Sequence, residues 1–181
     1  MTPQKLYKIQ CEIPENVVVE KHPTTLVFSG PLGSSALHLE KIDAEGTCAF
    51  SFCPTQARLT VITSSKASCG LLKKLIANKI QGVTRGFLVY LKILGIGYRA
   101  YLEKNTLIFK VGYSHDILYT IPSSIKLFLV DPTLLCIFGI EKNQVTEIAS
   151  KLRKLRAPSV YKGKGIRFQK EKIHLKTGKR K

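Results

Sequence analysis

The segment Glu103-Lys104-Asn105-Thr106-Leu107-Ile108-Phe109 repeats a pattern that occurs earlier in the chain. In the earlier copy, Glu20-Lys21 precedes Thr25-Leu26-Val27-Phe28. A glycine follows each copy, at Gly30 and at Gly112. Short apolar runs rich in β-branched and aromatic residues, bounded by turn-forming residues, predict β-strands. The repeat therefore predicts that one strand arrangement occurs twice, although a chance match of two similar patterns is the alternative.

Each copy continues into a stretch with the periodicity of an α-helix. When Lys66 is aligned with Lys142, apolar residues coincide at spacings of three and four, as in helices with one buried face. We expect the first helix to begin after Ser65 and to end at Gln81-Gly82, and the second to extend to Arg156. The aligned apolar pairs are Cys69 with Val145, Leu72 with Ile148, and Ile76 with Leu152.

Strands followed by a helix, twice over, indicate an α+β protein. The chain has 181 residues, of which 44% are hydrophobic, and this is enough for two small globular domains. We expect two tandem repeats of a small, mainly antiparallel sheet with one helix packed on a face, plus a basic C-terminal extension. The expected ranges are residues 1–81 and 82–157 for the two repeat domains, and 158–181 for a basic C-terminal loop and tail.

The net charge of +17 predicts a polyanionic partner, because such an excess repels itself unless it is neutralised. Residues 151–181 hold 13 of the 29 basic residues but only one of the 12 acidic ones, Glu171. An anionic membrane surface would be an alternative partner, but this segment has no amphipathic stripe. No uncharged apolar run is long enough to span a bilayer, so we expect no membrane partner. A lysine-rich tail kept only for solubility is the simpler alternative.

The stretch Pro158-Ser159-Val160-Tyr161-Lys162-Gly163-Lys164-Gly165-Ile166-Arg167-Phe168 is suited to contact a nucleic-acid backbone. Its glycines allow close approach, its cations can bind phosphate oxygens, and its aromatic rings can stack. Basic residues at the end of the preceding helix extend this surface, although they also complement the helix dipole. The sequence has no zinc-finger, helix-turn-helix or RNP pattern, which favours structured RNA. The candidate RNA-binding residues are Arg99, Lys151, Arg153, Lys154, Arg156, Tyr161, Lys162, Gly163, Lys164, Gly165, Arg167, Lys170, Lys172 and Lys176.

Motifs of catalytic chemistry are weak in this chain. Gly95-Ile96-Gly97-Tyr98-Arg99-Ala100 matches a dinucleotide-binding pattern, but a strand rather than a helix is expected to follow it. A nucleotide-dependent enzyme is therefore the lesser hypothesis, and we expect a bend with Tyr98 packed and Arg99 facing outward. Ser114-His115-Asp116 cannot form a catalytic triad, because adjacent residues in an extended segment point to alternate faces. The five cysteines lack metal-ligand spacing and are expected to be reduced and mostly buried. We expect no cofactor, metal, small-molecule substrate or catalytic residue.

Three blocks of sequence together resemble the large-subunit ribosomal protein L6 family. They are Leu94-Gly95-Ile96-Gly97-Tyr98-Arg99-Ala100, Gly112-Tyr113-Ser114-His115, and the stretch from Leu152 to Phe168. With the duplicated architecture, the resemblance covers essentially the whole chain. It implies two α+β domains and a non-enzymatic role in binding large-subunit ribosomal RNA, near the translation-factor-binding side and beside neighbouring ribosomal proteins. The residues it implies for the RNA-facing loop are Tyr161, Lys162, Gly163, Lys164, Gly165 and Arg167.

The first half departs most from the usual bacterial pattern of this family, notably over Ala44 to Ser68. Its cysteines and phenylalanines are similar to those of an organellar relative. The resemblance therefore implies the large subunit of a mitochondrial ribosome, with a plastid or a bacterial cytoplasm as alternatives. The main RNA contacts are expected in the second domain and the C-terminal segment.

Overall fold

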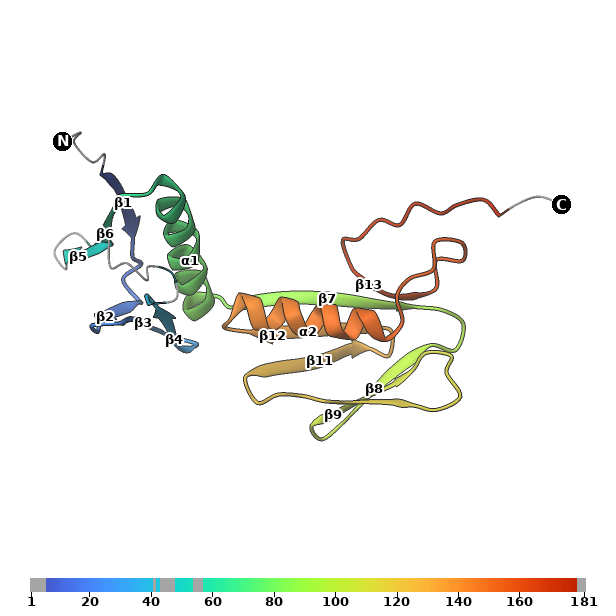
Figure 1. Ribbon diagram of the computed structural model, residues 1–181. Helices are drawn as coiled ribbons and strands as arrows, with labels where there is room; N and C mark the ends of the chain where they lie inside the picture. The colour runs from blue at the N-terminus through green and yellow to red at the C-terminus, as the bar shows by residue number, and fades with distance from the viewer. Residues whose placement is uncertain (1–5, 41, 43–47, 54–56, 179–181) are drawn as a thin grey trace. The chain divides into compact units, whose positions relative to one another are not determined.

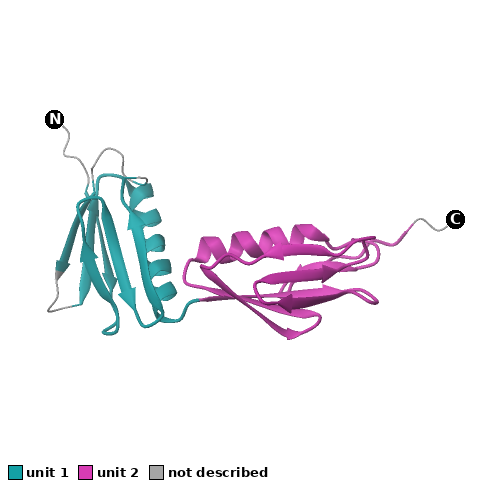
Figure 2. Cartoon of the chain, turned by 90° about the horizontal axis from the view of Figure 1, so that it is seen from below, with its two compact units in different colours: residues 1–86 teal, residues 87–181 magenta. Residues whose placement is uncertain are grey.

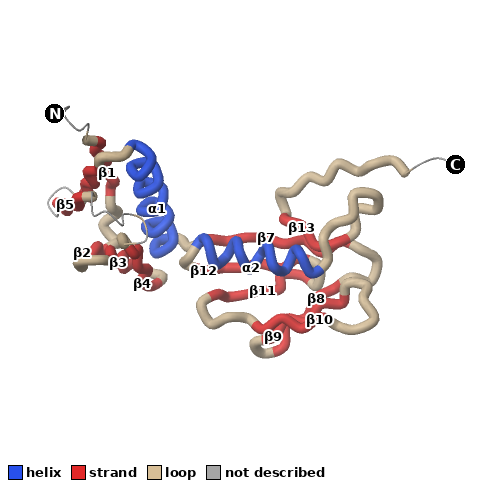
Figure 3. The backbone as a smooth tube through the Cα atoms, viewed as in Figure 1, coloured by secondary structure: helices blue, strands red, loops and turns tan. Residues whose placement is uncertain are grey.

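The chain, seen in a computed structural model, is described over residues 6–40, 42, 48–53 and 57–178. It separates into two compact units, residues 1–86 and 87–181 (Figure 2). In the described part, each unit contains two small antiparallel sheets and one helix (Figure 3). The predicted α+β class with repeated sheet units is therefore confirmed. The three predicted domain ranges stay a prediction.

Unit 1 combines two three-stranded sheets, of order β1-β6-β5 and β2-β3-β4, with helix α1 (Figure 1). The helix packs against strands of both sheets and buries Leu72 and Ile76 completely. Their partners in the core include Phe28 and Val61, which are also 0% exposed. The elements are β1 (Tyr7–Glu12), β2 (Val18–Lys21), β3 (Thr25–Gly30), β4 (Gly33–His38), β5 (Ala49–Cys53), β6 (Arg58–Thr63) and α1 (Lys66–Thr84).

Unit 2 repeats this arrangement and adds one strand. Its sheets have the orders β10-β9-β8 and β11-β12-β7-β13, and all neighbouring strands are antiparallel. Phe109, Ile137, Leu152 and Ile166 meet in one fully buried core. The elements are β7 (Phe87–Leu94), β8 (Arg99–Glu103), β9 (Thr106–Lys110), β10 (Ile117–Thr120), β11 (Ile125–Asp131), β12 (Leu134–Gly139), α2 (Lys142–Leu155) and β13 (Gly165–Phe168).

The repeat predicted from the letters is confirmed element by element. Strands β1 to β6 and helix α1 correspond in order and in pairing to β7 to β12 and helix α2. Lys66 and Lys142, which the sequence comparison aligned, are the first residues of the two helices. Thr25 and Thr106 are likewise the first residues of β3 and β9. The shared apolar spacing therefore reflects a shared fold.

Two strands escaped the sequence analysis. In β1 only Ile9 is buried, so its polar neighbours hide the strand pattern. Strand β13 lies inside the segment 158–181 that we expected to be a loop and tail, and this expectation was wrong for Gly165–Phe168. Ile166 and Phe168 alternate there toward the core, and Ile166 pairs with Ile93 of β7.

The helix limits also differ slightly from the prediction. Helix α1 continues past Gly82 to Thr84, because Val83 is fully buried in the core of unit 1. Ser65 occupies the N-cap position but makes no side-chain capping hydrogen bond. Helix α2 ends at Leu155, one residue earlier than expected.

The glycine-rich turn after β7 is a bend, as predicted, and it leads into strand β8 instead of a helix. The absence of a helix at this point removes the context that a dinucleotide site requires. A Cβ atom on Gly95 would lie 2.6 Å from the ring of Tyr98, and one on Gly112 would lie 2.8 Å from its Oη. The two glycines therefore make room for Tyr98, which packs against the core. Arg99 is exposed, as expected.

Replacing Gly112 by alanine is expected to destabilise the protein more than the same change at Gly97. Both glycines have positive φ, +77° and +75°, so alanine costs about 1–2 kcal/mol at either position. Only at Gly112 would the new methyl group also collide with Tyr98, since nothing lies within 4 Å of it at Gly97. Denaturant unfolding of Gly112→Ala and Gly97→Ala measures the difference. Equal destabilisation would contradict the role given to Gly112.

Candidate nucleic-acid interface

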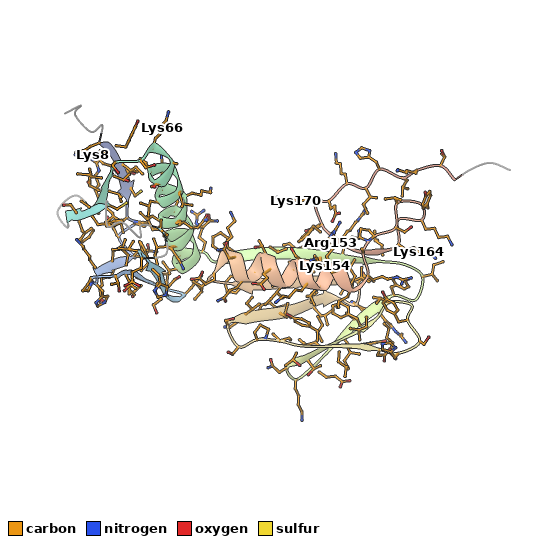
Figure 4. The ribbon with its side chains drawn as sticks, viewed as in Figure 1. Lys8, Lys66, Arg153, Lys154, Lys164 and Lys170 are labelled. Carbon is orange, nitrogen blue, oxygen red and sulfur yellow. The ribbon has the colours of Figure 1, made fainter. Side chains whose placement is uncertain are left out.

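Basic side chains gather at the end of unit 2 where α2 runs into the 156–164 loop and β13. Figure 4 shows this for four labelled side chains: Arg153, Lys154, Lys164 and Lys170. Several lysines here are exposed and form no ion pair with another described residue. They are Lys154, Lys162, Lys164, Lys170, Lys172 and Lys176.

The loop between α2 and β13 is closed by its own backbone. The amide of Ser159 donates to the Lys164 carbonyl at 2.9 Å, and the amide of Gly163 donates to the Ser159 carbonyl at 2.8 Å. The Ser159 hydroxyl oxygen also accepts a hydrogen bond from the Tyr161 amide at 3.3 Å. Gly163 has φ +67°, a conformation that favours glycine. This ordered turn presents Tyr161, 63% exposed, and Lys162 to solvent.

Strand β13 anchors the other end of the loop. Gly165 has φ +140°, and a Cβ atom there would lie 2.7 Å from Cα of Pro158, so the two chain segments touch. The amide of Ile166 donates to the Arg156 carbonyl at 2.8 Å. Because Ile166 is fully buried, the basic loop is held against the apolar core at its base.

Arg153, one of the candidate RNA ligands, is engaged within the protein. Its Nε donates to Oε2 of Glu171 at 3.0 Å, and its Nη2 donates to Oε1 of the same carboxylate. The amide of Phe168 donates to Oε2 of Glu171 as well, at 3.2 Å. The hydrogen bonds from Arg153 hold the pKa of Glu171 below its usual value. This bidentate pair fastens the chain beyond β13 to helix α2.

Arg156 is also in contact with side chains of unit 2. Its guanidinium lies 4.8 Å from the ring centroid of Tyr113, and hydrogen bonds to Tyr113 and Tyr98 raise its pKa. Tyr113 Oη donates to the Leu155 carbonyl at 3.0 Å, which satisfies an acceptor at the C-terminal end of α2. Through Arg156, the turn that contains Tyr98 and the turn that contains Tyr113 both contact the start of the basic loop.

Three other candidates have distinct surroundings. Lys151 pairs with Glu147 at 2.7 Å on the exposed surface of α2. Arg99 begins β8 and lies 5.3 Å from the ring centroid of Tyr101. Arg167 is half-buried on β13, and its Nε is the one buried side-chain nitrogen or oxygen in the described residues without a hydrogen-bond partner.

The sequence analysis did not assign a role to Glu171, Tyr98 or Tyr113 at this site. Glu171 had a signal, since it is the one acidic residue among the 13 basic residues of the C-terminal segment. The tyrosines were visible only as parts of the glycine-containing blocks. Of the cysteines expected to be mostly buried, Cys136 is buried, whereas Cys11 and Cys69 are half-buried. The described residues contain no cluster of metal-ligand type and no helix able to cross a membrane.

Comparison with known proteins identifies the family. The family described as Ribosomal protein L6 matches residues 94–169, which include the Tyr98 turn, α2 and β13. The chain is 45% identical to large ribosomal subunit protein uL6m of Prototheca wickerhamii, with 94% of each chain covered. The chain belongs to the ribosomal protein L6 family. Among bacterial L6 proteins, it is 35% identical to uL6 of Xanthobacter autotrophicus (98% of this chain, 99% of that one) and 37% identical to uL6 of Thermotoga maritima (97% and 98%).

The L6 relationship establishes the broad role of this chain. It is a structural protein and not an enzyme. It is part of the large ribosomal subunit, which also contains ribosomal RNA and other ribosomal proteins. The predicted family is confirmed. The similarity to uL6m also confirms the predicted mitochondrial location.

The Arg153–Glu171 pair predicts a pH-dependent contribution to stability. Arg153 lowers the pKa of Glu171 in the folded protein below 4.5, the usual pKa of a glutamate. The ionised carboxylate therefore stabilises the fold at pH values above 4.5. This contribution disappears as the pH falls from 4.5 through the lowered pKa. At neutral pH, Glu171→Gln should cost about 1–2 kcal/mol, because one charge-assisted hydrogen bond is weakened. Urea unfolding at several pH values measures both effects, and an unchanged pH profile in the variant would exclude this contribution.

Proposed function

We propose that this chain binds large-subunit ribosomal RNA through unit 2 and its basic C-terminal segment. The observation that supports this most is the ordered turn from Ser159 to Lys164, which holds Lys162 and Lys164 in solvent. Neither lysine has an ion-pair partner among the described residues. A fixed loop with unneutralised cations is suited to phosphate groups, because binding restricts little further conformational freedom.

The predicted site residues have different roles in this proposal. The exposed lysines of the loop and tail contact phosphate groups, as point charges. Arg153 and Arg156 position the loop, because Glu171 and the two tyrosines engage their guanidinium groups. Gly163 and Gly165 permit the tight path of the backbone. Tyr161 is exposed at the loop tip, where its ring can contact a sugar or a base.

We further propose that this site lies near the translation-factor-binding side of the subunit, as the resemblance to the family implies. A single cysteine introduced at Lys164, Lys164→Cys, can carry a short crosslinker on purified ribosomes. Crosslinks to a bound translational GTPase would support the location. Crosslinks to RNA and ribosomal proteins only, with the factor demonstrably bound, would exclude it.

Changing Lys162, Lys164 and Arg167 together to alanine should weaken binding to large-subunit RNA and reduce the dependence of affinity on salt. For every phosphate that the variant no longer neutralises, the slope of log affinity against log salt concentration should decrease in magnitude by about 0.7–0.9. Filter binding at several salt concentrations gives both quantities. Circular dichroism and thermal unfolding of the same variant show that the fold is retained.

A matched control removes three exposed cations from unit 1, by Lys8→Ala, Lys66→Ala and Lys74→Ala. The net charge changes equally in both variants, so only a local site distinguishes them. The unit 1 variant should keep most of the affinity. An equal decrease in the two variants would show that binding follows total charge, and the proposed site would be wrong.

A further inference from the structure

The four-stranded sheet of unit 2 has one buried face and one open face. Side chains of β7 and β12 that point to the buried face, such as Leu91, Ile93 and Ile137, are at most 2% exposed. They pack with α2 and with β9 in the core. The alternate side chains point the opposite way. We call that surface the open face.

The strand register defines which residues share the open face. One row across the strands contains Lys126, Phe138 and Leu88, and the next contains Phe128, Cys136 and Tyr90. A third row contains Asp131, Leu134, Lys92 and Arg167. Phe128 is 50% exposed and Leu88 48% exposed, and Tyr90 and Phe138 are half-buried. The open face thus combines three aromatic rings with three cations, and the acidic residue in these rows is Asp131, at the end of β11.

Unit 1 provides an internal comparison, because its β5, β6 and β1 correspond to β11, β12 and β7. By register, Phe128 corresponds to Ser51 and Tyr90 to Gln10. The third ring, Phe138, lies four residues before α2, and its counterpart four residues before α1 is Ile62. None of the three aromatic positions of unit 2 is therefore aromatic in unit 1.

The charges on this face also differ between the two units. In unit 1, Arg58 and Glu12 lie side by side in the row that corresponds to the third row of unit 2, and they pair at 3.7 Å. The other cation in the corresponding rows is Lys8, at the position of Leu88. Each unit thus has one acidic residue in this row, Glu12 in unit 1 and Asp131 in unit 2, and the sheet of unit 1 folds without a row of aromatic rings.

The difference between the two copies indicates binding rather than folding. A half-exposed phenylalanine contributes little to stability, and an aromatic patch in water favours association with a partner. The three cations outnumber the one acidic residue of these rows, Asp131, and this excess of positive charge favours a polyanion. Aromatic rings beside cations are the surface that unpaired nucleotides use, since bases stack on rings while phosphates contact Lys and Arg.

We propose that the open face binds an unpaired segment of the large-subunit ribosomal RNA. Bases stack on Phe128, Tyr90 and Phe138, and phosphates contact Lys92, Lys126 and Arg167. The proposal rests on the RNA-binding function proposed above and extends it, because Arg167 belongs to both the basic segment and the open face.

The test replaces open-face aromatics by the residues that unit 1 uses at the same positions, as Phe128→Ser and Tyr90→Gln, in the full chain. Affinity for the large-subunit RNA transcript should fall by about tenfold for each base that no longer stacks. The salt slope should stay unchanged, because stacking releases no counterions. The control is Phe52→Ser, which removes a 39% exposed phenylalanine from β5 of unit 1 and should leave the affinity unchanged. Thermal unfolding checks that each variant is folded.

Two outcomes separate this proposal from the broader one. If the loop variant binds RNA more weakly while folded open-face variants keep their affinity, the RNA-binding function stands and the open-face proposal is overturned. If neither binds more weakly, both are overturned. A second experiment needs no variant: 4-thiouridine-substituted transcript is photo-crosslinked to the wild-type chain. Crosslinked peptides from β7 or β11 support the proposal. RNA crosslinks confined to residues 158–178, with a ribosomal protein crosslinked to the open face in intact subunits, overturn it.

Discussion

Strand β7 is the element on which unit 2 depends, because it pairs with β12 on one edge and with β13 on the other. The second pairing brings Ile166 and Phe168 into the core and continues as the amide of Gln169 donates to the Tyr90 carbonyl at 3.0 Å. The C-terminal segment is thus part of the sheet. A loop dense in cations would repel itself, and burial of these two apolar residues supplies free energy that opposes the repulsion.

The arginines at the end of α2 differ from the lysines of the loop and tail in the partners of their charged groups. Arg153 and Arg156, near the C-terminal end of α2, are bound by Glu171 and by tyrosines, so their guanidinium groups already have partners within the protein. The exposed lysines of the loop and tail, Lys162, Lys164, Lys170, Lys172 and Lys176, have no ion-pair partner among the described residues. This distribution of arginine and lysine agrees with their physical properties. The planar guanidinium group is suited to fixed contacts, and the ammonium group is suited to a hydrated surface.

The sequence predicted the repeated elements well, because apolar spacing within one strand or helix is a local signal. It failed for β1 and β13, whose strand character depends on partners distant in the chain. The same limit applies to the site. Composition located the basic segment, but it could not show that Arg153 meets Glu171, 18 residues away, or that Tyr113 reaches Leu155, 42 residues away. Contacts of this kind exist only once the sheet has formed.

Duplication explains why one fold can perform two tasks. In both units, alternate side chains of the central strand must point into the core. The inward residues of β6 and β12 are therefore similarly apolar, for example Val61 and Ile137. Outward residues are free of that constraint and can diverge. On the outward rows compared above, unit 1 has no aromatic residue and pairs an arginine with a glutamate, whereas unit 2 combines three aromatic rings with three cations and one acidic residue, Asp131. Since the shared framework is held constant, residues that differ on equivalent surfaces report function more directly than the fold does. This criterion supports the proposal that unit 2 binds RNA.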